Sequence, residues 1–188
     1  MKMGKKLAVP VNETDHSKGP ADAVLELVEY GDYECPYCGQ AFGIVSRLLE
    51  TFGEDLRYVF RNFPLPDIHP RALDAAKAAE AAALQRRYWP MHQAIYENQN
   101  SLDQDSLLGF AEEIGLNLNQ FERAMKSPTV MRHIDADIEG GNQSGVTSTP
   151  SFFINGRKYE GDWSYESLHD VLEAIRKGET LEGYFKAA

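Results

Sequence analysis

Hydrophobic and polar residues follow one another along the chain in patterns that predict an ordered series of strands and helices. A mostly apolar run at 24–30 predicts a first strand, and alternation at 56–60 predicts a second. Between them, apolar residues recur at three- and four-residue spacing. This recurrence predicts a helix that begins near Cys35 and ends at Gly53, a left-handed cap. Because a helix connects the two strands, we expect them to run parallel.

The middle of the chain is predicted to be helical. Alanines at 72, 76, 79 and 83 share one stripe, which indicates close packing against another helix. The expected helices are one with Pro70 in its first turn, one at Tyr88–Tyr96, one capped by Asp103 and ended by Gly115, one from the cap Asn119 to Met125, and one from Pro128 to Gly140-Gly141. Five helices are more than a crossover requires, so we predict an inserted helical domain at 67–143.

Strand character returns near the end of the chain. Ser151–Ile154 and Arg157–Tyr159 flank Asn155-Gly156, which is the strongest short signal for a β-hairpin. Ser164 is expected to cap a last helix that ends at Gly178. We therefore predict an α/β domain built from 21–66 and 144–178. An arm at 1–20, with a short edge strand at 8–11, precedes it, and an acidic tail at 179–188 follows.

Composition narrows the class of protein. The 188 residues are 43% hydrophobic and 26% charged, which is typical of a globular chain with a core. The length fits one domain with a large insertion. The formal net charge is −10, and Lys and Arg form no cluster that would follow a phosphate backbone. Nucleic acid is therefore excluded as an expected partner.

The N-terminus carries lysines at 2, 5 and 6, but the apolar stretch 7–11 is too short for a secretory signal and contains Pro10. No run has the length needed to span a bilayer, so we expect no membrane insertion. These features predict a cytoplasmic protein. A periplasmic or other extracytoplasmic location is the alternative if an upstream signal has been removed.

The candidate chemistry lies in Cys35-Pro36-Tyr37-Cys38, where the first strand gives way to a helix, and the chain has no other cysteine. At a helix N-terminus, unpaired backbone N–H groups and the helix dipole favour the thiolate of Cys35. Pro36 fits the first helical turn because it lacks only an N–H group that would be unpaired there. Cys38 lies one turn further and should be more shielded. We therefore expect Cys35 to attack a partner disulfide and Cys38 to resolve the mixed disulfide.

Two other interpretations of the cysteines are a partial zinc site and a pair of inert core residues. Zinc usually takes four ligands. The histidines are scattered, with no pair at ligand spacing: His16, His69, His92, His133 and His169. We therefore expect no metal and no cofactor other than a redox-active Cys35–Cys38 disulfide. Thr149-Pro150 precedes the later strand, and X-Pro bonds supply nearly all cis peptides, but taken alone it is an ordinary turn proline.

Two stretches together resemble a known family. Residues 29–38 (Glu-Tyr-Gly-Asp-Tyr-Glu-Cys-Pro-Tyr-Cys) and 145–156 (Gly-Val-Thr-Ser-Thr-Pro-Ser-Phe-Phe-Ile-Asn-Gly) are similar to the DsbA-like branch of the thioredoxin superfamily. The resemblance covers about residues 20–178, and the helical block resembles the inserted domain of that branch. It implies a thioredoxin-like fold with a helical insertion and a protein disulfide oxidoreductase.

The resemblance also implies roles for single residues. Cys35 corresponds to the nucleophile and Cys38 to the resolving cysteine. Thr149-Pro150 corresponds to a cis bond that faces the disulfide and helps to bind extended substrate chains. Glu29 corresponds to a buried acid six residues before the nucleophile.

The position of Glu29 agrees with that role, because it shares a strand face with Leu25 and Leu27 and would point into the core beneath the thiols. Burial would raise the pKa of its carboxyl, which could then relay a proton to or from Cys38. The alternative is a strand-end side chain that reaches solvent. Asp32 and Glu34 are expected to be exposed, and their charges would oppose a low thiolate pKa.

Two departures from the family bear on function. Exporting members have a signal peptide and this chain shows none, so their membrane reoxidation partner is not expected. Pro36-Tyr37 between the cysteines resembles glutaredoxins, which keeps glutathione open as a partner. The expected function is disulfide exchange with cysteine-containing protein substrates and a redox partner. The alternatives are a glutathione-dependent enzyme acting on small molecules and a non-catalytic redox-sensing module. Oxidase, reductase and isomerase roles are equally compatible with the sequence.

Overall fold

A computed structural model describes residues 4–179, which divide into two compact units. The sheet unit comprises residues 4–30, 40–61 and 140–179, and the helical unit comprises 31–39 and 62–139. The expected insertion therefore falls mainly in the helical unit, which also includes the cysteine segment. The predicted tail lies outside the described residues except for Glu179. Within residues 4–179, no helix combines the length and apolar character needed to cross a bilayer.

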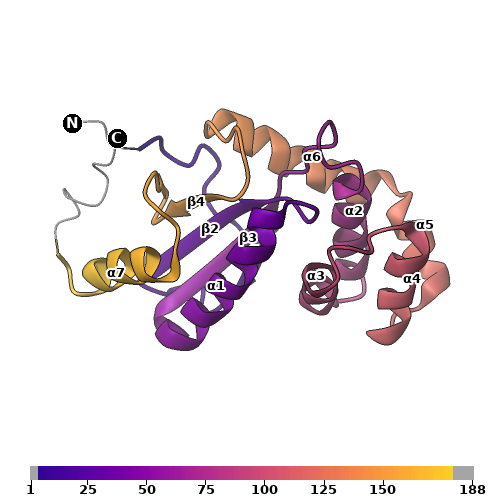
Figure 1. The fold of residues 1–188 in the computed structure, drawn as a ribbon, viewed down its shortest axis with the longest axis horizontal. Helices are drawn as coiled ribbons and strands as arrows, with labels where there is room; N and C mark the ends of the chain where they lie inside the picture. Colours follow the sequence, from indigo (N-terminus) through magenta and orange to yellow (C-terminus); the bar gives the residue numbers. More distant parts are fainter. Residues whose placement is uncertain (1–3, 180–188) are drawn as a thin grey trace. The chain divides into compact units, whose positions relative to one another are not determined.

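Within residues 4–179 the sheet has five strands in the order β1-β3-β2-β4-β5. Figure 1 labels β3, β2 and β4, with β2 in the middle. The strands are β1 (His16–Lys18), β2 (Leu25–Gly31), β3 (Leu56–Asn62), β4 (Ser151–Ile154) and β5 (Arg157–Lys158). The helices are α1 (Pro36–Phe52), α2 (Ala72–Ala83), α3 (Tyr88–Glu97), α4 (Gln104–Glu113), α5 (Leu118–Met125), α6 (Pro128–Gln143) and α7 (Tyr165–Arg176), with a short 3-10 turn at Gly53–Asp55. The predicted α/β fold is confirmed.

β2 and β3 are neighbours, and their C-terminal ends meet where the Phe63 N–H donates to the Gly31 carbonyl (2.8 Å). This is the arrangement expected of two strands joined by a crossover helix. The pairs β1–β3, β2–β4 and β4–β5 are antiparallel, so the sheet is mixed. α1 and α7 lie together, because the Arg47 guanidinium stacks 3.8 Å from the centre of the Tyr165 ring.

Local signals in the sequence placed several turns and caps correctly. Asn155 and Gly156 have φ angles of 45° and 72°, the left-handed conformations that a two-residue hairpin turn requires. The Asp103 side chain accepts a hydrogen bond from the Ser106 N–H and caps α4. Ser164 caps α7 in the same way. Each of these signals acts within a few residues, so distant packing does not override it.

Three predicted helix boundaries were wrong. α5 is capped by Asn117, whose side chain accepts from the Gln120 N–H (2.9 Å), and not by Asn119, which lies inside the helix. α6 continues through Gly140-Gly141, because the left-handed residue that follows the helix is Gly145 (φ 76°). Pro70 precedes α2 and is not part of its first turn.

The alanine-rich helix α2 lies at the centre of the helical unit, in contact with α3 and α5 (Figure 1). The alanines at 72, 76 and 79 are buried, as the stripe predicted, and the one at 83 is partly exposed. Side chains this small let neighbouring helices approach closely. Close packing therefore compensates for the modest apolar area of each alanine.

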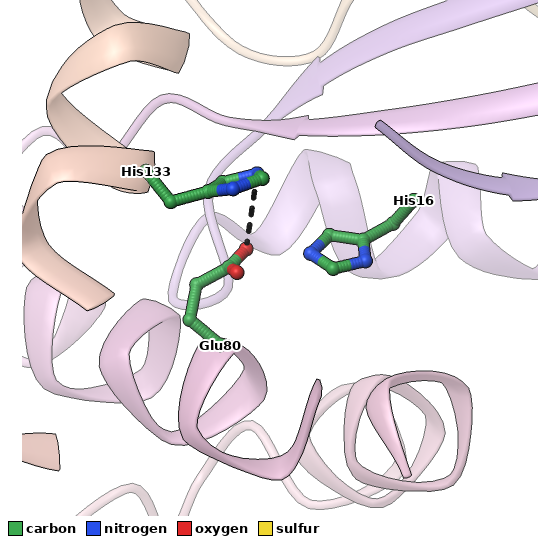
Figure 2. Close-up of side chains that lie close together, drawn as sticks. All are labelled: His16, Glu80 and His133. Atoms are coloured by element: carbon green, nitrogen blue, oxygen red, sulfur yellow. Dashed lines mark ion pairs between the residues drawn. The ribbon is translucent and has the colours of Figure 1, made fainter. Parts of the chain in front are cut away.

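A polar cluster is also buried in the helical unit. The Asn62 side-chain amide donates to Glu80 (2.8 Å) and to Asp137 (3.0 Å), and its backbone N–H also donates to Asp137 (2.9 Å). The His133 imidazole lies 3.8 Å from Glu80 and 3.9 Å from Asp137; Figure 2 shows the contact with Glu80. Burial is the main reason why the pKa of Asp137 rises from 3.8 to about 6.

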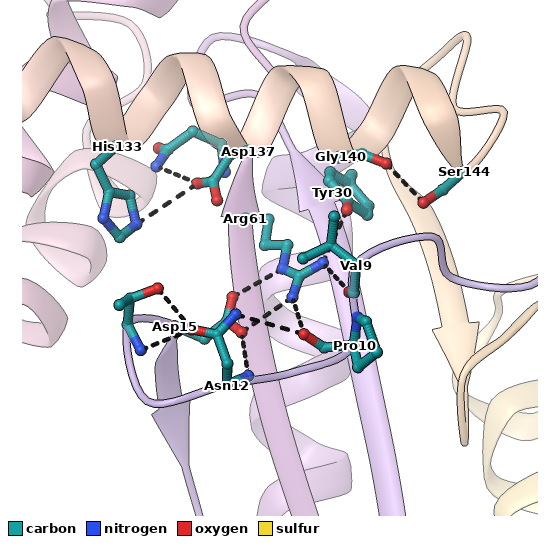
Figure 3. Close-up of polar contacts among 12 residues, drawn as sticks. Val9, Pro10, Asn12, Asp15, Tyr30, Arg61, His133, Asp137, Gly140 and Ser144 are labelled. Atoms are coloured by element: carbon teal, nitrogen blue, oxygen red, sulfur yellow. Dashed lines mark hydrogen bonds and ion pairs between the residues drawn. The ribbon is translucent and has the colours of Figure 1, made fainter.

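The N-terminal arm is held by a buried arginine. The guanidinium of Arg61 donates to both carboxylate oxygens of Asp15 (2.7 and 2.9 Å), to the carbonyls of Val9 and Pro10, and to the Tyr30 hydroxyl (Figure 3). The predicted edge strand at 8–11 is therefore wrong, because carbonyls of this stretch bind the arginine. The strand of the arm is β1 instead, which pairs with β3.

Replacing Arg61 with methionine should destabilise the fold by about 3–5 kcal/mol, because the change leaves the carboxylate of Asp15 buried without its countercharge. The free energy of urea-induced unfolding measures the loss. Arg176→Met is the matched control, since Arg176 forms ion pairs at the surface and its removal should change stability little. Equal losses in the two variants would contradict the structural role of the buried pair.

The raised pKa of Asp137 predicts how stability depends on pH. Between pH 4 and pH 6 the folded state binds this proton more tightly than the unfolded state, whose carboxyl titrates near 3.9, so stability falls as pH rises. Asp137→Asn removes the effect. Between pH 4 and pH 6.5, the free energy of urea-induced unfolding of this variant should therefore rise by roughly 2–3 kcal/mol relative to that of the wild type.

The exposed residue Asp135, on the same helix, provides the control for this measurement. Asp135→Asn should give a stability curve parallel to that of the wild type across the same pH range. A parallel curve for Asp137→Asn as well would show that the buried carboxyl does not titrate in this window.

Candidate active site

The two cysteines lie at the N-terminus of α1. Pro36 is the first residue of the helix, Cys35 directly precedes it, and the Gly39 N–H donates to the Cys35 carbonyl (3.1 Å). Cys35 is 4% exposed and Cys38 is fully buried, so Cys38 is the more shielded thiol, as predicted. Tyr37, between them, is 60% exposed. At this helix start, Pro36 and Tyr37 are therefore exposed while both cysteines are buried.

Asp32 is hydrogen-bonded to both cysteines. Its backbone N–H donates to the Cys38 Sγ (3.4 Å), while its carbonyl oxygen and Oδ1 each accept from the Cys35 N–H (3.2 Å). Oδ1 also accepts from the Glu34 N–H (2.8 Å). The expectation that Asp32 is exposed was wrong, because its exposed fraction is 1%.

The burial of Asp32 depends on donors that lie more than thirty residues further along the chain. Its Oδ2 accepts from the Leu65 N–H (2.9 Å) and lies 2.9 Å from the His69 Nδ1. The one local signal for this role was an aspartate shortly before a helix start, where a side chain can accept backbone N–H groups. Glu34, in contrast, is partly exposed and accepts from the Arg71 N–H.

Gln99, which the sequence did not single out, clamps the same segment. Its Nε2 donates to the Tyr33 carbonyl (2.8 Å) and to the Cys35 carbonyl (3.0 Å). The amide fits because position 39 is glycine: a Cβ there would lie 2.1 Å from the Gln99 Oε1. The clamp therefore holds the backbone on both sides of Glu34.

Tyr33 anchors this segment in a group of aromatic side chains from α3. Its hydroxyl lies 3.0 Å from the His92 Nδ1 and 3.2 Å from the Tyr88 hydroxyl, and its ring packs against Tyr96. Burial raises the pKa of Tyr88 well above its ordinary value, so its hydroxyl stays neutral at physiological pH. Tyr33 is thus fixed at both its side chain and its carbonyl.

The remaining predicted residues belong to the sheet unit. Glu29 is 1% exposed and accepts a hydrogen bond from the Tyr58 hydroxyl (2.7 Å), so it does not reach solvent. The Thr149–Pro150 peptide bond is cis and directly precedes β4. The roles of Glu29, Thr149 and Pro150 in the chemistry stay predictions.

Several possible metal ligands in the helical unit contact other polar side chains. His69 pairs with Asp32, and Glu80, His133 and Asp137 form the polar cluster around Asn62. Glu80 and His133 together offer only part of the four-ligand set that zinc usually takes. Disulfide chemistry at Cys35 and Cys38 needs no metal.

A family model described as thioredoxin matches residues 11–174, which is most of the chain. The chain belongs to the thioredoxin family. A solved thioredoxin-like oxidoreductase from Silicibacter pomeroyi DSS-3 is 29% identical, with a TM-score of 0.79 over 88% of this chain and 94% of that one.

The thiol-disulfide exchange protein α-DsbA2 from Wolbachia pipientis has the same fold at 21% identity, with a TM-score of 0.78 over 87% of this chain and 88% of its own. The DsbA-like form of the thioredoxin fold, with its helical insertion, is therefore confirmed.

This thioredoxin-family chain is also similar to part of a much longer protein. It is 41% identical over 177 residues to the Na(+)/H(+) antiporter NhaA 1 of Mycolicibacterium gilvum. The match covers 93% of this chain but 29% of that relative. The chain thus spans less than a third of the length of this curated relative.

Proposed function

We propose that the protein is a thiol–disulfide oxidoreductase that exchanges disulfides with cysteine-containing proteins through Cys35 and Cys38. The observation that carries the proposal is the position of the pair. Cys35 directly precedes α1, and Cys38 is the third residue of the helix. The family and the DsbA-like fold support the same chemistry.

In the reducing direction, the Cys35 thiolate attacks one sulfur of a substrate disulfide and forms a mixed disulfide, and the substrate's other sulfur leaves as a thiolate. The Cys38 thiolate then attacks the Cys35 sulfur. The second substrate sulfur leaves as a thiolate, and a Cys35–Cys38 disulfide remains. Two electrons pass from the cysteine pair to the substrate. The oxidising direction is the reverse, and a redox partner restores the starting form.

The surrounding residues supply parts of this mechanism. The helix N-terminus favours the thiolate of Cys35 because its N–H groups and dipole stabilise negative charge. The exposed Tyr37 offers an apolar contact to a substrate chain. We extend the proposal to Thr149 and Pro150 as residues that bind an extended substrate segment. We also include Glu29 as a buried carboxyl that exchanges a proton with Cys38.

Single cysteine variants test the mechanism in two assays, the reduction of insulin and the oxidation of reduced ribonuclease. Cys35→Ser should lose activity in both, because it lacks the attacking sulfur. Cys38→Ala should accumulate a mixed disulfide with substrate, visible as a higher-mass band on non-reducing gels. The double variant Cys35→Ser/Cys38→Ala is the control and should trap nothing. Full activity in Cys35→Ser would refute the proposal.

A second candidate function follows from the similarity to NhaA 1. We propose, as the alternative, that the redox pair serves as a redox-sensing module attached to a sodium–proton antiporter. The 41% identity over nearly the whole chain favours this candidate over other binding modules. The chemistry at Cys35 and Cys38 would be the same, but the protein that responds to their redox state would be a transporter.

An antibody raised against this chain distinguishes the two candidates in fractionated cells of the source organism. A free-standing enzyme should give a band near the mass of 188 residues outside the membrane fraction. An antiporter module should give a membrane-bound band about three times as long, as the covered share of NhaA 1 indicates.

A further inference from the structure

Asp32 is hydrogen-bonded to both cysteines and to residues 34, 65 and 69, and the proposed mechanism does not use it. We infer that the buried Asp32 carboxylate is a positioning residue that limits the oxidising power of the Cys35–Cys38 pair. It does so by holding a negative charge against the backbone of Cys35. This inference rests on the proposed disulfide exchange and concerns how the same site is tuned.

Four hydrogen-bonding groups surround the carboxylate. Three of its partners are backbone N–H groups, those of Glu34, Cys35 and Leu65, and the fourth is the imidazole of His69. An ionised carboxylate offers about four acceptor positions and no proton, so this set of partners matches it. The three N–H groups can only donate, while the His69 Nδ1 on Oδ2 can donate or accept according to its tautomer. The backbone partners therefore fit a carboxylate that accepts hydrogen bonds.

The negative charge of Asp32 disfavours the Cys35 thiolate, which is the form that the mechanism uses. A helix N-terminus stabilises a thiolate through backbone N–H groups, but the N–H of Cys35 is directed to the Asp32 side chain and carbonyl. A carboxylate this close also repels a thiolate, and its burial reduces the screening by water. Asp32 thus makes the reduced, thiolate-bearing state less favourable relative to the disulfide.

Other charged groups around Asp32 modify this effect without removing it. His69 lies on Oδ2 and partly compensates the charge whenever its ring carries a proton. Glu34 adds a second carboxylate, but it is partly exposed and bound to the Arg71 N–H. Of these side chains, it is Asp32 whose carboxylate accepts from the Cys35 N–H.

Equilibration with glutathione tests the inference on the intact chain. Two glutathione thiols reduce the Cys35–Cys38 disulfide and form one glutathione disulfide, so the reduced fraction reports the relative stability of the two states. Asp32→Asn keeps an acceptor oxygen but removes the charge. It should become half-reduced at a roughly tenfold lower ratio of squared glutathione to glutathione disulfide, and its thiolate pKa should fall by about one unit.

Glu34→Gln is the matched control, because it removes the same charge from a residue adjacent to Cys35 that does not bond to the Cys35 N–H. We expect it to shift the ratio much less than Asp32→Asn. If Asp32 were only structural, Asp32→Asn would destabilise the oxidised and reduced forms equally and leave the ratio unchanged. That result, or a shift toward a more reducing pair, would overturn the inference.

A substitute variant and the activity of the wild type separate the role of Asp32 from the proposed function. If Asp32→Asn does not fold, Asp32→Ser takes its place, since its hydroxyl can accept a hydrogen bond without the charge, and the same shift is expected. If the wild type equilibrates with glutathione and loses activity in Cys35→Ser, the proposed function stands and only the role of Asp32 is in question. A wild type that forms no Cys35–Cys38 disulfide would refute both.

Discussion

The turn between β2 and α1 depends on one buried carboxylate. The Asp32 carboxylate accepts hydrogen bonds from the N–H groups of Glu34 and Cys35, and the Asp32 N–H donates to the Cys38 sulfur. Its other carboxylate oxygen contacts Leu65 and His69. Burying a polar side chain is unfavourable unless its hydrogen bonds are made. The conformation of the cysteine segment and the path of the chain after β3 are therefore fixed together.

Much of the fold could be predicted because its signals are local. The strand at the start of the sheet domain, the helix after the cysteines, the Asn155-Gly156 hairpin and the caps of α4 and α7 each depend on a few adjacent residues. The cysteine pair could be found for the same reason. Two cysteines three positions apart at a strand–helix junction need no tertiary information to be recognised.

The residues that sequence reasoning missed are those whose partners lie far away. Asp32, Arg61 and Asn62 are charged or polar residues that a hydrophobic pattern assigns to the surface or to strand ends, yet all three are buried. Each is compensated by groups between 18 and 75 positions away in sequence, which no periodicity displays. Gln99 and its clamp belong to the same class.

The fit between Gly39 and Gln99 couples two positions that lie sixty residues apart. A Cβ at position 39 would meet only the flexible end of Gln99, so the glutamine could move aside at little steric cost. Moving it would nevertheless break its hydrogen bonds to the carbonyls of Tyr33 and Cys35. The smallest side chain at position 39 is thus a condition for these hydrogen bonds to the backbone beside Cys35. Any larger residue there should evolve together with a different residue at position 99.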